Sequence, residues 1–153
     1  MSSDFSFPIH QPMIRLLGVA FDQFAIEHAQ RVAAAGYPDI RPGHGCVFGG
    51  IDPENGSRLT DLADRAMMTK QTVGDVVTDL ENRGYLERVP DPTDGRAKII
   101  RLTSKGRDVY FTGWRLNNEL EQEWAKRFGE DRVAALREVL EFVHAKRFDS
   151  APA

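Results

Sequence analysis

Between residues 59 and 102, helical and strand patterns follow one another so closely that few folds can accommodate them. Apolar residues at Leu59, Leu62 and Ala63 predict a short helix, which residues 66–68 connect to the next one. Thr69 is a good N-cap for this second helix. Its apolar side chains fall within an arc of about 100°, and they are Val73, Val76, Val77 and Leu80.

Two strands follow the second helix. The helix is predicted to end at residues 82–84, with Gly84 where a left-handed cap would sit. Residues 85–89 and 97–102 have strand composition, and the segment between them is a polar hairpin tip. Thr103 then caps another long helix. This is the order of a winged helix-turn-helix, so we predict a mainly α fold with a small two-stranded β-wing.

The second helix carries polar residues opposite its apolar stripe. In a helix-turn-helix the N-terminal part of this helix enters the major groove of DNA, where glutamine can bind adenine and threonine can contact a thymine methyl. We therefore predict a DNA-contacting set on this helix: Thr69 as its cap, Lys70 and Thr72 on phosphates, Gln71 on a base, and Thr78 or Asp75 as further base contacts.

The hairpin tip carries the remaining candidates. Arg96 on a protruding ribbon suits the negative potential of a narrow minor groove. Asp94 is expected to orient Arg96, although it could instead simply hold the turn, and Lys98 is expected to support the wing on the DNA backbone.

Four segments within residues 58–107, about a third of the chain, together resemble one family. The run LTDLADRAMMTKQTV at 59–73 resembles the helix-turn-helix of the MarR family of bacterial transcription regulators. LENRGYLER at 80–88 looks like its helix-to-wing junction, and DPTDGRAK at 91–98 is similar to its wing. LTSKGR at 102–107 is similar to the start of its next helix.

The resemblance implies a domain plan and a mode of action. It implies a homodimer formed through helices at 13–36 and 104–148, around a winged helix-turn-helix domain at 40–103. The helix-turn-helix lies at about 59–83 and the wing at about 85–102. A two-fold dimer would read a pseudo-palindromic operator with half-sites about 34–36 Å apart. Family members usually repress genes and leave DNA when a small, often aromatic, effector binds; the effector-binding residues here are unknown.

The charge distribution leaves a second interpretation open. The net charge is −3, but residues 58–107 hold 10 basic and 8 acidic side chains, a local net of +2. Asp75 and Asp79 lie on or beside the expected DNA-facing surface, where they would repel phosphate. The alternative is a winged-helix protein-interaction module that has lost DNA binding, and salt-dependent binding to a duplex distinguishes the two.

The lone cysteine supplies another alternative. Cys46 follows His44, which could lower the pKa of the thiol, so a redox-sensing regulator is a further hypothesis. A metal site would need ligands from distant segments, because His44 and Cys46 do not share a helix face. We expect no metal and no cofactor.

Enzymes and membrane proteins are not expected. The sequence has no Gly-x-Ser-x-Gly, phosphate-loop or His-Glu-x-x-His motif, so we predict no catalytic residues. It has no apolar run near the ~18 residues of a membrane span, and its N-terminus does not resemble a secretory signal. A cytoplasmic protein is the expectation, with a flexible N-terminal arm at 1–12 and a fraying tail from Asp149.

Overall fold

The computed structural model describes residues 11–149, which fall into two compact units divided between Gly113 and Trp114. Most of the predicted N-terminal arm, residues 1–10, and most of the predicted tail, residues 150–153, lie outside the described residues. None of the helices within residues 11–149 is both long enough and apolar enough to cross a lipid bilayer.

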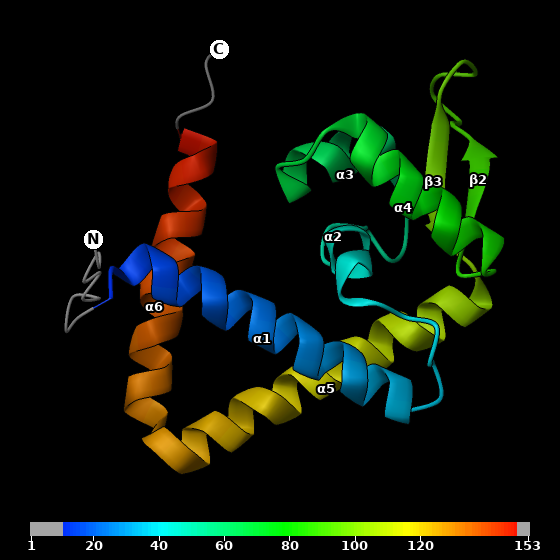
Figure 1. Cartoon of the computed structure of the whole chain (residues 1–153). Helices are drawn as coiled ribbons and strands as arrows, with labels where there is room; N and C mark the ends of the chain where they lie inside the picture. The colour runs from blue at the N-terminus through cyan, green and yellow to red at the C-terminus, as the bar shows by residue number, and fades with distance from the viewer. Residues whose placement is uncertain (1–10, 150–153) are drawn as a thin grey trace, which may run out of the picture. The chain divides into compact units, whose positions relative to one another are not determined.

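Helices dominate the chain, as predicted (Figure 1). In chain order the elements are α1 (Met13–Ala34), η1 (Pro42–His44), α2 (Gly45–Phe48), β1 (Ser57–Arg58), α3 (Leu59–Ala66), α4 (Lys70–Asn82), β2 (Leu86–Pro90), β3 (Lys98–Leu102), α5 (Ser104–Phe128) and α6 (Glu130–Asp149). The first unit holds everything up to the middle of α5. The second holds the rest of α5 and α6.

The sheet has three antiparallel strands in the order β1-β3-β2, so the predicted two-stranded wing is present as β2 and β3, and β1 adds a third strand that was not predicted. Ser57 and Arg58 pair with Ile100 and Ile99 of β3. A two-residue strand is too short to show any alternation in the sequence. The close approach of β1 to β3 depends on Gly56, where φ is +74° and a Cβ would lie 2.5 Å from the Ile100 carbonyl oxygen.

The apolar stripe of α4 forms part of the core of the first unit. Val73, Val77 and Leu80 are fully buried, together with Leu62 of α3 and Ile100 of β3. The fourth predicted stripe residue, Val76, is only half-buried. Figure 1 shows α4 running beside β2 and β3. Because the stripe residues Val73, Val77 and Leu80 are buried, the stripe is the side of α4 that faces the core.

The predicted helix boundaries are confirmed at their caps. Thr69 Oγ1 accepts a hydrogen bond from the Thr72 N–H at 3.1 Å, and Thr103 Oγ1 accepts one from the Gly106 N–H at 3.0 Å. Gly84 and Gly129 have φ of +79° and +97°, as expected where α4 and α5 end. These caps set the starting points of the recognition helix and of α5.

Candidate nucleic-acid interface

The outward face of α4 presents the polar residues that the sequence predicts. Lys70, Gln71 and Thr72 are exposed in its first turn, and Asp75 and Thr78 are exposed one and two turns further on. The first turn of a helix also has backbone N–H groups without partners inside the helix, which favour an anion such as phosphate. One cation, Lys70, and several hydrogen-bonding groups therefore lie at the N-terminal end of α4.

Asp79, at the edge of this face, is not an unpaired charge. Its half-buried carboxylate accepts hydrogen bonds from Arg83 Nε at 2.8 Å and from His44 Nε2 at 3.0 Å. The hydrogen bond from Arg83 holds the pKa of Asp79 below its usual range, with a smaller contribution from His44. Asp79 is thus a neutralised anchor between α4 and the segment before α2, and Asp75 is the acid that stays on the outward face.

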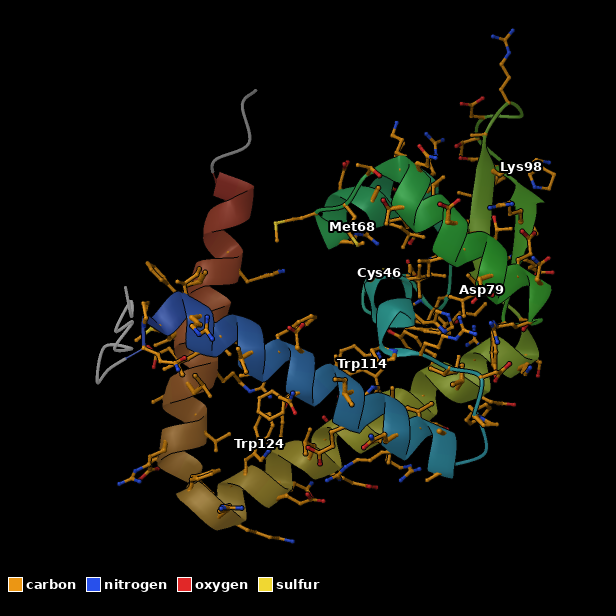
Figure 2. The ribbon with its side chains drawn as sticks, in the orientation of Figure 1. Cys46, Met68, Asp79, Lys98, Trp114 and Trp124 are labelled. Atoms are coloured by element: carbon orange, nitrogen blue, oxygen red, sulfur yellow. The ribbon has the colours of Figure 1, made fainter. Side chains whose placement is uncertain are left out.

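The tip of the wing is held by Asp94. Its Oδ1 accepts a hydrogen bond from the backbone N–H of Arg96 at 3.1 Å. Of the two roles considered for Asp94, this geometry favours holding the turn. Both Arg96 and Lys98 have exposed side chains, and Lys98 lies near the tip of the ribbon in Figure 2.

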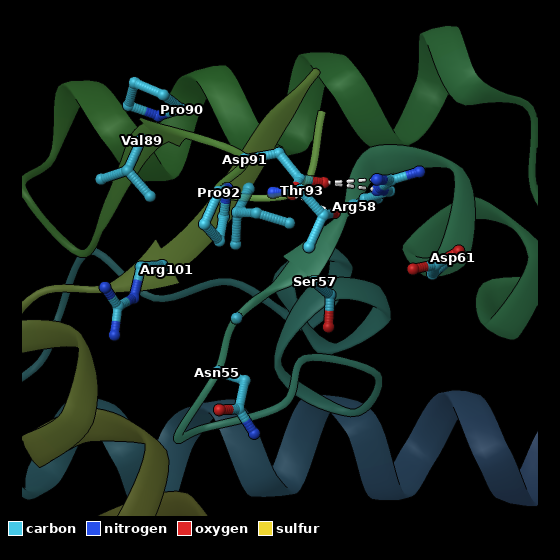
Figure 3. Close-up of a pocket in the computed structure, with 12 residues that line it drawn as sticks. Asn55, Ser57, Arg58, Asp61, Val89, Pro90, Asp91, Pro92, Thr93 and Arg101 are labelled. Atoms are coloured by element: carbon cyan, nitrogen blue, oxygen red, sulfur yellow. Dashed lines mark hydrogen bonds and ion pairs between the residues drawn. The ribbon is translucent and has the colours of Figure 1, made fainter. Parts of the chain in front are cut away.

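The root of the wing is fixed by an ion pair that sequence reasoning missed. The buried carboxylate of Asp91 accepts hydrogen bonds from the Thr93 hydroxyl at 2.7 Å, the Thr93 N–H at 2.8 Å and Arg58 Nε at 2.8 Å (Figure 3). The bonds from Thr93, followed by Arg58, lower the pKa of Asp91 to about 2. An aspartate two residues before a threonine is a local turn signal that could have been found; its pairing with Arg58, 33 residues away, could not.

The geometry of residues 40–103 is that of a winged helix-turn-helix, and family comparison agrees with it. The model of the MarR family matches residues 40–97. The match covers the whole helix-turn-helix and β2 of the wing. Among curated relatives, the transcriptional regulator HosA of Escherichia coli O111:H- is 26% identical over 109 residues, which cover 71% of this chain and 81% of HosA.

Solved structures of MarR-family proteins share the fold. The apo form of MarR from E. coli has a TM-score of 0.67 at 23% identity, with 88% of this chain and 98% of that chain covered. A Staphylococcus aureus MepR variant bound to an oligodeoxyribonucleotide has a TM-score of 0.56 at 21% identity, with 88% and 94% covered. At these identities the likeness shows the fold.

The geometry around Cys46 contradicts the proposed activation by His44. His44 Nδ1 accepts from the Arg41 N–H at 3.1 Å while Nε2 donates to Asp79, so both ring nitrogens are engaged elsewhere. The thiol donates to the Gly43 carbonyl at 3.2 Å, and burial raises its pKa. A reactive cysteine needs the opposite shift. Over the described residues, no group of three or more His, Cys, Asp or Glu side chains is placed to hold a metal ion.

The burial of His44 predicts that the stability of the protein depends on pH. The residue is 4% exposed, and its burial lowers its pKa below the ordinary 6.5, against the opposing effect of the Asp79 hydrogen bond. Protonation of Nδ1 would also replace the acceptor for the Arg41 N–H by a second donor. Because the folded-state pKa is below the unfolded-state pKa, the unfolded chain binds more protons as the pH falls through 6.5. The contribution of His44 is thus fully present above pH 6.5 and is lost as the pH falls through the folded-state pKa.

We expect the free energy of unfolding of the wild type to decrease between pH 7.5 and pH 5.5, and the decrease to be smaller in His44→Asn. Urea unfolding at one fixed protein concentration measures both. Carboxylates with lowered pKa values, such as Asp79 and Asp91, titrate below this window. An equal decrease in the two proteins would assign the pH dependence to other groups.

Proposed function

We propose that this protein is a transcriptional regulator of the MarR family that binds double-stranded DNA sequence-specifically, with α4 in the major groove and the wing tip in the adjacent minor groove. The observation that carries the proposal is the division of α4 into two faces. Val73, Val77 and Leu80 are fully buried, whereas Gln71 and Thr78 are exposed on the opposite side. In the proposed complex Lys70 and Thr72 contact phosphates, Gln71 reads a base, Arg96 enters the minor groove, and Lys98 supports the wing.

A relative and the neutralisation of Asp79 support this proposal. The MepR structure of the same fold is bound to an oligodeoxyribonucleotide. The alternative, a protein-interaction module without DNA binding, rests mainly on the negative charges of Asp75 and Asp79. Asp79 is paired with Arg83, so its charge no longer supports this alternative.

The proposed active form is a homodimer on a pseudo-palindromic operator. Support comes from apolar side chains that each unit leaves exposed. On α1, Ile14 is 80% and Phe21 is 70% exposed, and on α6, Phe142 is 61% and Val143 is 62% exposed. Exposed apolar surface of this kind marks interaction sites. Light scattering after size exclusion would give about twice the monomer mass of 17.2 kDa if the proposal is correct.

We further propose that the protein represses its target and leaves the operator when a small, often aromatic, effector binds. This part rests on the resemblance to the MarR family. No effector-binding residue is assigned. A library of small aromatic acids and phenols, added to a preformed complex with operator DNA, tests the proposal by loss of fluorescence anisotropy.

Binding to the intergenic DNA upstream of the chain's own gene tests the central proposal. Fluorescence anisotropy at two salt concentrations, against a scrambled duplex, measures affinity, selectivity and salt slope together. A protein that neutralises phosphates must lose affinity as salt rises. Selective, salt-dependent binding supports the regulator described above, whereas no selectivity at low salt supports the protein-interaction module.

Gln71→Ala should relax the sequence preference more than it changes the salt slope. A side chain that reads a base carries sequence information, while a phosphate contact adds mainly to the counterion effect. Lys70→Ala is the matched control from the same turn of α4, and we expect it to lower the slope by about one unit. A change in the slope alone for Gln71→Ala would move this residue to the phosphate-contacting group.

A further inference from the structure

Arg88 of β2 links the wing to the outward face of α4. Its Nη2 donates to Thr78 Oγ1 at 3.1 Å, and its Nη1 lies 2.9 Å from Glu81 Oε2. Thr78 and Glu81 are three residues apart and thus neighbours on the helix surface. The two arms of one guanidinium therefore hold a single turn of α4 against the wing strand.

This contact and a bond within α4 use the proton of the Thr78 hydroxyl and one of its two lone pairs. Thr78 Oγ1 donates its proton to the Gly74 carbonyl at 2.9 Å and accepts from Arg88. Two hydrogen bonds from opposite partners fix the χ1 rotamer of a β-branched side chain that is already stiff. The hydroxyl then has no proton to donate to a ligand, whereas the γ-methyl of this exposed side chain can meet a ligand without breaking either hydrogen bond.

We propose that Arg88 is a positioning residue that locks Thr78 so that its γ-methyl, not its hydroxyl, reads the C5-methyl group of a thymine. This inference rests on the proposed DNA binding and specifies the base at one position of each half-site. Apolar contact with the thymine methyl is an established form of readout in the major groove. Because the guanidinium of Arg88 is paired with Glu81, we do not count Arg88 among the residues that contact phosphates.

The test removes single methyl groups from the DNA and from the protein. The probe is a duplex that the wild-type protein selects from a random pool, with each thymine replaced in turn by deoxyuridine. At one thymine of each half-site, we expect the replacement to weaken wild-type binding about fourfold, the value for one buried methyl group. Thr78→Val keeps the methyl on a side chain that is stiff in a helix without the hydrogen bond from Arg88, so it should keep this sensitivity. Thr78→Ser keeps the hydroxyl and should lose it.

Arg88→Gln tests the positioning role itself. We expect Arg88→Gln to reduce the ratio of the affinities for the thymine and deoxyuridine duplexes at the same position, and to leave the salt slope unchanged. The matched control is Arg101→Gln, which removes the same charge from a neighbouring β3 residue that pairs with Glu87 and not with Arg88. It should leave the ratio unchanged.

Three outcomes would contradict parts of this account, and they are distinguishable. If Thr78→Ser retains the wild-type ratio at every thymine, the methyl readout is wrong. If Arg88→Gln lowers the salt slope by about one unit, Arg88 is a phosphate contact. If the wild type selects no sequence at all, the proposed DNA binding fails, and the inference fails with it.

Discussion

Gly106→Ala is expected to destabilise the protein by at least about 3 kcal/mol, through forced overpacking of backbone against backbone. Gly106 lies in the first turn of α5, where a Cβ would stand only 1.9 Å from the Tyr85 carbonyl oxygen and 3.0 Å from its carbonyl carbon. That carbonyl also accepts the Thr103 N–H at 3.1 Å, so moving it breaks the junction between β2 and α5. Tyr85 itself is fully buried, which leaves no room for relief on the other side.

Gly113→Ala is the matched control in the same helix. A Cβ at Gly113 would stand 3.5 Å from His28 Cε1, an ordinary van der Waals contact. Alanine is a better helix former than glycine, so this variant should be as stable as the wild type or more stable by up to about 1 kcal/mol. Urea or thermal unfolding of both variants at one concentration checks the difference. Equal stabilities would show that α5 can shift away from β2 at little cost.

Local patterns in the sequence were sufficient for the elements around α4. The spacing of Val73, Val77 and Leu80, the Thr69 cap and the Gly84 stop are all properties of a few neighbouring residues, and all three are confirmed. The resemblance to the MarR family was carried by the same stretch. The winged helix-turn-helix and the resemblance to the family therefore followed from residues 58–107 alone.

Contacts between distant segments could not be predicted in this way. Asp79 was expected near the DNA because helix spacing places it at the edge of that face. Its partner His44 lies 35 residues earlier, and no local pattern connects the two. The same holds for Arg58 with Asp91, and for the third strand, whose two residues have no alternation to detect. These long-range polar pairs set the orientation of α4 and of the wing, so the fine geometry of the site came only from the structure.

Arg96→Ala is expected to weaken DNA binding by ~1–3 kcal/mol, an increase in Kd of roughly 5- to 150-fold. The Asp94 carboxylate holds the backbone N–H of Arg96 at 3.1 Å, so the turn that presents the arginine survives when the side chain is removed. A guanidinium in a narrow minor groove experiences an enhanced negative potential. The loss should therefore be larger on an operator whose flanks are A-tracts than on one whose flanks are rich in G and C.

Arg101→Ala is the charge-matched control for this prediction. Arg101 also has an exposed side chain on β3, but it lies at the end of the strand away from the tip, where its Nη2 is 3.4 Å from the Glu54 carbonyl oxygen. If Arg96 acts by entering the groove, its removal should cost more affinity than removal of Arg101 and should show the dependence on the flanking sequence. Equal losses in the two variants would mean that only the net charge of the wing matters. Unchanged affinity in Arg96→Ala would remove the wing tip from the mechanism and leave α4 as the sole reader.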